Sequence, residues 1–111
     1  MRYMALIYAT EGSPEAEAPE VFPAYAAFSE EVNRAGVMRA GDPLQATATA
    51  TTVRVRNGKT TATDGPFAET REQLGGFYIF DCKDLDEAIA WAAKIPSAKF
   101  GSIEVRPIWE M

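Results

Sequence analysis

The residues best suited to chemistry lie together in the segment DGPFAETREQLGG, which begins at Asp64. Asp64, Gly65 and Pro66 form a turn sequence, because aspartate accepts hydrogen bonds from nearby backbone N–H groups and proline fixes its own φ. One interpretation is that the turn only redirects the chain. The other is that it aims the Asp64 carboxylate into a cleft, where burial raises its pKa enough for general acid or base catalysis.

Further charged residues follow the turn. Glu69, Arg71 and Glu72 are close enough in sequence to pair with one another. A self-paired loop in solvent is one interpretation, since exposed ion pairs contribute little to stability. The alternative makes Arg71 an anchor for a carboxylate or phosphate of a ligand, which its planar guanidinium suits. The Gly75-Gly76 pair that follows is too short to be a phosphate-binding loop.

Composition excludes several classes of site. The 111 residues contain no histidine and a single cysteine, Cys82, so histidine-based catalysis and the usual zinc sites are absent, and no cofactor is expected. The 11 Lys and Arg residues against 16 Asp and Glu give a net charge of -5, which argues against direct nucleic-acid binding. The short apolar start MRYMALIY predicts neither a signal peptide nor a membrane span, so we expect a cytoplasmic protein.

Hydrophobic patterning predicts the elements that position these residues. Residues 2–8 and 77–82 are apolar on both alternating faces, which is typical of central strands, and Cys82 lies at the end of the second as a small buried hydrophobe. Shorter strands are predicted at 37–44 and 103–108. A first helix, ended by Gly36, is indicated by apolar residues at steps of four and three: Val21, Tyr25, Phe28, Val32 and Ala35.

A second helix is predicted after the capping residue Asp84, with Glu87 three residues on, and Pro96 ends it. Between the two halves of the chain, residues 50–63 predict a hairpin, because Asn57-Gly58 suits a type I′ turn in which both positions need positive φ. Its threonine-rich arms have polar faces. We therefore expect it to lie outside the core sheet and either to extend an edge or to reach a partner subunit.

The predicted order is βαβ, hairpin, βαβ. This order favours an α+β fold, a ferredoxin-like split βαβ sheet with a β-hairpin insertion and two helices on one face, within a single domain at 1–111. Two helices cover only one side of the sheet. The apolar residues on its other side need a cover that this chain does not supply, and a second copy is the simplest one.

Four segments resemble the DGPF group of the YCII-related family over nearly the whole chain: the run from Asp64 to Phe80, the opening RYMALIY, the turn AGDPLQ and the terminal GSIEVRPIWE. The resemblance implies a dimeric α+β barrel, in which two ferredoxin-like sheets face one another, in a small and mostly bacterial protein. Fusion of some relatives to sigma-factor domains implies a link to transcription initiation. Other relatives pair a first-helix histidine with an aspartate, whereas this chain has Tyr25 near that place. Only an aspartate of the Asp64 type carries over, with Tyr25 as a weak donor.

We therefore expect a homodimer that binds a small molecule or has a regulatory role, with no metal. The alternative is an enzyme of the dimeric α+β barrel type, which uses Asp64 for proton transfer on a small organic substrate. Under both hypotheses the site is a cleft where polar residues lie beside apolar walls. The residues expected to border it are Asp64, Gly65, Pro66, Phe67, Arg71, Tyr25 and Asp42.

Overall fold

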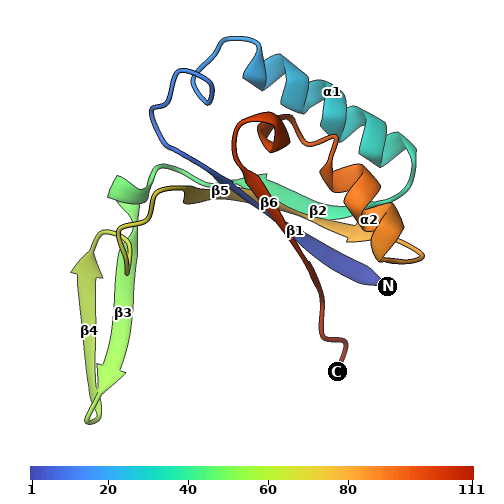
Figure 1. Ribbon diagram of the computed structural model, residues 1–111. Coiled ribbons are helices and arrows are strands. Elements are labelled where there is room, and N and C mark those ends of the chain that lie inside the picture. The colour runs from blue at the N-terminus through green and yellow to red at the C-terminus, as the bar shows by residue number, and fades with distance from the viewer.

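Four antiparallel strands form the central sheet of the computed structural model, which describes residues 1–111 (Figure 1). Across the sheet their order is β2-β5-β1-β6, so β1 and β5 are the central strands, as the patterning predicted. This arrangement confirms the ferredoxin-like sheet. The strand bounds are Arg2–Ala9 (β1), Met38–Pro43 (β2), Gln73–Asp81 (β5) and Ser102–Pro107 (β6).

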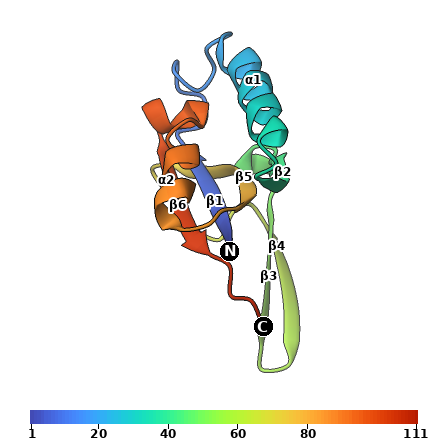
Figure 2. The same ribbon diagram turned by 90° about the vertical axis from the view of Figure 1, so that its right-hand side faces the viewer.

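Both helices cover the same face of this sheet (Figures 1 and 2). They are α1 at Val21–Arg34 and α2 at Leu85–Ala92, and neither is both long and apolar enough to cross a lipid bilayer. The buried core lies between them and the sheet, because alternate residues of the central strands point toward the helices. It contains Tyr3, Ala5, Ile7, Phe28, Val32, Val37, Tyr78, Phe80, Cys82, Ala88, Ala92 and Ile95.

The second helix begins where the sequence predicted and ends earlier. The Asp84 carboxylate accepts a hydrogen bond from the Glu87 backbone N–H at 2.9 Å, which confirms the cap. The α-helix ends at Ala92 rather than at Pro96. Ile95 is extended, at ψ 127°, because the residue before a proline is disfavoured in the helical conformation. A short 3-10 helix, η2 at Pro96–Lys99, follows instead.

The predicted hairpin forms a separate two-stranded sheet, β3 at Thr51–Arg56 and β4 at Lys59–Asp64, and projects away from the core (Figure 1). Asn57 and Gly58 have φ values of 53° and 76°, which confirms the turn. The hairpin does not extend an edge of the central sheet. One face is also less polar than predicted, because strand alternation places Val53 and Val55 together on it, both exposed.

The sheet face away from the helices has no cover within the chain. Strand pairing sets Met4 beside Ile79 and Leu6 beside Phe77 on this face, and all four side chains are partly exposed. We call it the open face. Because it is apolar on both central strands, it is the surface that the sequence analysis expected a second copy to cover.

Candidate functional site

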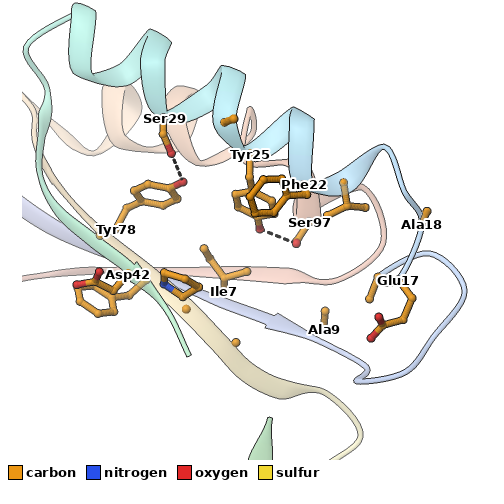
Figure 3. Close-up of a pocket in the computed structure, with 18 of the residues that line it drawn as sticks. Ile7, Ala9, Glu17, Ala18, Phe22, Tyr25, Ser29, Asp42, Tyr78 and Ser97 are labelled. Carbon is orange, nitrogen blue, oxygen red and sulfur yellow. Dashed lines mark hydrogen bonds between the residues drawn. The ribbon is translucent and has the colours of Figure 1, made fainter. Parts of the chain in front are cut away.

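A cavity of about 680 Å³ lies between α1 and the sheet, where the chain leaves β1 through residues 10–20 (Figure 3). Ile7, Val21 and Met38 give it apolar walls. Gly41 on β2 also lines it, and a Cβ at this position would lie only 2.6 Å from Cδ1 of Tyr78. The glycine therefore lets the Tyr78 ring lie against β2 beside the cavity.

One polar contact in the cavity joins α1 to η2. The Tyr25 hydroxyl and the Ser97 Oγ are 2.6 Å apart, and either can donate (Figure 3). Ser97 is a buried polar residue, held in place by the 3-10 turn that Pro96 begins. Burial raises the pKa of Tyr25, and the opposing effect of its hydrogen bonds with Ser97 is smaller. Tyr25 is therefore a neutral hydroxyl at physiological pH and not a base.

A second hydroxyl pair lies one helical turn further along α1. Ser29 Oγ and the Tyr78 hydroxyl are 2.8 Å apart (Figure 3). Both residues line the cavity, and the Tyr78 side chain also packs edge-on against Phe28 in the core. The cavity thus combines apolar walls with two pairs of hydroxyl groups, which suits a small organic molecule with a few polar atoms.

The charged side chains that line the cavity are both carboxylates. Glu17 and Asp42 are exposed, and neither forms an ion pair. Because Gly41 faces Tyr78 on the helix side of β2, the alternation of the strand turns the Asp42 side chain toward the open face. Asp42 therefore borders the cavity at its rim and does not project into its interior.

The structure brings together two of the predicted site residues, Tyr25 and Asp42, and places the others elsewhere. Asp64 is the exposed last residue of β4, and Phe67 is 78% exposed. Gly65 closes the base of the hairpin: its N–H donates to Ala50 O at 2.7 Å, and its carbonyl accepts from Thr52 Oγ1 at 2.8 Å. The turn at Asp64 therefore has a structural role, and its catalytic role stays a prediction.

The remaining residues of that segment, Pro66 and Arg71, are also exposed and do not line the cavity. The backbone carbonyl of Arg71 accepts a hydrogen bond from Thr10 Oγ1 at 3.1 Å, which ties the segment to the end of β1. The Arg71 guanidinium forms no ion pair with Glu69 or Glu72. Its use as a ligand anchor in this cavity has no support from its position.

Sequence reasoning missed three of the four hydroxyl groups. Ser29 had a detectable signal, because it lies four residues after Tyr25 and so on the same face of the helix. Tyr78 lies in the central strand predicted at 77–82, and it is buried while its hydroxyl reaches Ser29. Ser97 had no signal, because only the packing of η2 against α1 brings it to Tyr25.

Comparison with known proteins agrees with this architecture. The sequence model of the YCII-related domain matches residues 1–111. The chain belongs to the YCII-related domain family. This confirms the resemblance carried by the DGPF segment. A relative in Rhizobium meliloti (strain 1021), an uncharacterised protein, is 51% identical over 67 residues, which are 59% of this chain and 54% of that protein. The match therefore spans about half the length of the relative.

Among solved structures, the YCII-related chain is similar to 5-chloro-2-hydroxyhydroquinone dehydrochlorinase (TftG) from Burkholderia phenoliruptrix AC1100, in complex with 2,5-dihydroxybenzoquinone. The TM-score is 0.61, and the match covers 99% of this chain and 94% of that one. The sequences are 15% identical, so the likeness shows a shared fold.

Proposed function

We propose that this YCII-related protein binds a small organic molecule in the cavity between α1 and the sheet. The observation that carries the proposal is the pair of hydroxyl contacts, Tyr25–Ser97 and Ser29–Tyr78, set among apolar walls. The cavity volume of about 680 Å³ falls within the usual range of ligand sites, roughly 300–1,000 Å³. The ring compound bound by TftG supports a small-molecule role for this fold.

Filling the cavity tests the proposal. Ala26 is exposed on α1 and lines the cavity, so Ala26→Trp places a large ring at its opening. We expect the wild type to bind the uncharged fluorescent probe N-phenyl-1-naphthylamine and Ala26→Trp to lose this binding. Ala90→Trp is the matched control, because Ala90 is exposed on α2 and does not line the cavity. Equal probe binding by both variants would contradict the proposal.

A second candidate is catalysis by proton transfer, which the name of the structural neighbour favours. Asp64 lies at the base of the hairpin and does not line the cavity of the same chain. It would therefore act only on a ligand bound in the cavity of another copy. Asp42 is the carboxylate of β2 at the rim. An enzyme that uses either group should lose activity about a hundredfold or more in Asp64→Asn or Asp42→Asn. Chloride release from 5-chloro-2-hydroxyhydroquinone is the assay.

We further propose that the protein is a homodimer formed through the open face. A folded monomer of 12.1 kDa exposes about 6,000 Å². This chain exposes 7681 Å², and part of the excess lies on the projecting hairpin. A standard interface covers roughly 800 Å² per partner, so the excess exposed area is large enough for one such interface.

Leu6→Asp should give a monomer by light scattering, whereas Thr61→Asp on the hairpin should not. A regulatory role in transcription stays a prediction.

A further inference from the structure

The charges around the cavity restrict the ligands that can enter it. None of the side chains lining it is Lys or Arg, and its two charged groups, Glu17 and Asp42, are carboxylates without ion-pair partners. An anion that enters the cavity has no cation to bind. It meets repulsion from Glu17 and from Asp42, which lies at the rim with its side chain turned toward the open face. At separations of several ångströms, one such repulsion weakens binding about threefold to thirtyfold.

The hydroxyl pairs define where polar atoms of a ligand would lie. Each pair contains two O–H groups and uses one of them in its internal hydrogen bond, so the other can donate to a ligand. Tyr25 and Ser29 are one turn apart on α1, a rise of about 6 Å along the helix axis. The two hydroxyl pairs therefore lie at successive positions along the cavity wall that α1 forms.

An aromatic side chain at the cavity suits a flat ligand. Phe22 lines the cavity and is 83% exposed, although it lies on the same helix face as Tyr25 (Figure 3). Leaving a large aromatic ring in water is unfavourable, and a planar ligand that stacks on it would remove this cost. The cavity therefore offers the exposed aromatic face of Phe22, two hydroxyl contacts and an acidic rim.

We propose that the cavity selects uncharged ring compounds that carry hydroxyl or carbonyl oxygens, and discriminates against the same ring when it carries a carboxylate. The acidic rim provides the discrimination, and Ser29 and Ser97 with their tyrosine partners bind the oxygens. This inference rests on the proposed function, because it assigns a ligand class to the same cavity.

Displacement of N-phenyl-1-naphthylamine by two matched compounds tests the inference. Hydroquinone is uncharged at neutral pH, and 2,5-dihydroxybenzoate adds one carboxylate to the same ring. We expect the benzoate to bind at least about tenfold more weakly, in keeping with repulsion from two carboxylates. Equal displacement by both compounds, or displacement by neither, would overturn the inference. The proposed function would stand in either case if Ala26→Trp still abolished probe binding.

Variants assign the selectivity to residues. In the double variant Glu17→Gln with Asp42→Asn, the affinity ratio of the two compounds should fall to about threefold or less. The control Glu69→Gln with Asp86→Asn removes the same two charges from exposed positions away from the cavity and should leave the ratio at its wild-type value. A ratio that stays at wild type in the double variant would overturn the role of the acidic rim.

The hydroxyl contacts have a separate test. Two double variants, Tyr25→Phe with Ser97→Ala and Ser29→Ala with Tyr78→Phe, each remove both O–H groups of one pair. Each should weaken the binding of hydroquinone about threefold to tenfold, the effect of one lost hydrogen bond. Binding of N-phenyl-1-naphthylamine, which has no oxygen, should change less. If the hydroxyl groups have a purely structural role, the affinities for both ligands should fall equally. That result would overturn the assignment of these hydroxyl groups.

Discussion

Strands β4 and β5 are consecutive in the chain, but β5 lies in the centre of the main sheet and β4 lies in the exposed hairpin. In β5, Tyr78 is 6% exposed and Phe80 is 0% exposed, because α1 and α2 cover one face and neighbouring strands pair on both sides. In β4 every residue is exposed, and its one partner is β3. The comparison shows that strand propensity determines the extended conformation of both segments. Their burial depends on whether helices pack on the strand and whether other strands pair with it on both sides.

The two regions also differ in what they can do. β5 contributes Tyr78 to the core and to the cavity, so the same strand supports the fold and the site. The hairpin contributes nothing to the core cluster and carries Val53 and Val55 exposed on one face, with Arg54 and Arg56 on the other. Changes in β5 should therefore be costly for the whole domain, and changes in the hairpin should be local.

The largest expected effect is at Phe80. Phe80→Ala removes a fully buried ring and should lower the free energy of unfolding by about 3–5 kcal/mol. Val53→Ala in the hairpin, at a position that is 62% exposed, should change it by less than about 0.5 kcal/mol. Urea unfolding of both variants, made in the Leu6→Asp background to remove association, measures the difference. Similar losses for the two would contradict the comparison.

A smaller effect should appear at high pH through Cys82, which follows β5. Burial raises the pKa of its thiol to about 11, with smaller contributions from Glu87 and Asp81. The folded state therefore retains the proton more tightly than the unfolded chain, whose thiol ionises near pH 8.5–9. This stabilisation is complete below that pH, and it is lost as the pH rises toward 11.

We expect the free energy of unfolding to fall between pH 9 and pH 11 by on the order of 2 kcal/mol more in the wild type than in Cys82→Ala. Tyrosine and lysine titrations occur in both proteins and cancel in this difference. Chemical unfolding at a series of pH values measures it. Parallel curves for the two proteins would show that Cys82 is not shielded as the structure indicates.

The smallest expected effect is at the hairpin turn. Gly58 has φ +76°, and a valine in this left-handed region costs about 1–2 kcal/mol. In Gly58→Val the backbone amides of β3 and β4 should exchange with solvent faster, while those of β1 and β5 stay at their wild-type rates. Thr60→Val places the same side chain at an ordinary strand position and is the control. Unchanged hairpin exchange in Gly58→Val would argue against the turn.

Local signals made most of the fold predictable. Asn57-Gly58 determines its turn through backbone geometry. The two-sided apolar pattern identified β1 and β5, because these central strands carry apolar residues on both the helix side and the open face. The end of α2 was predicted too late, since Ile95 is buried like a helix residue although its backbone is extended. The spacing of apolar residues alone does not distinguish the last turn of a helix from a buried, extended residue that follows it.

The site was less predictable. Of the residues expected at the site, Tyr25 and Asp42 line the cavity, and each lies on an element whose position the fold determines. Their role in binding stays a prediction. The segment from Asp64 to Arg71 concentrates charge in the sequence, but the direction in which the hairpin leaves the sheet carries it away from the cavity. That direction depends on tertiary packing. Ser97 was missed for the same reason.

Neighbouring residues of β1 provide the most direct test of ligand binding in the cavity, because Ile7 lines the cavity and Leu6 lies on the open face. Nuclear Overhauser effects from bound N-phenyl-1-naphthylamine to assigned side chains would locate the ligand. We predict cross-peaks to Ile7, Tyr25 and Met38, whose side chains surround the cavity. Cross-peaks to Leu6 and Ile79 without any to Ile7 or Tyr25 would place the ligand on the open face and contradict the proposed function.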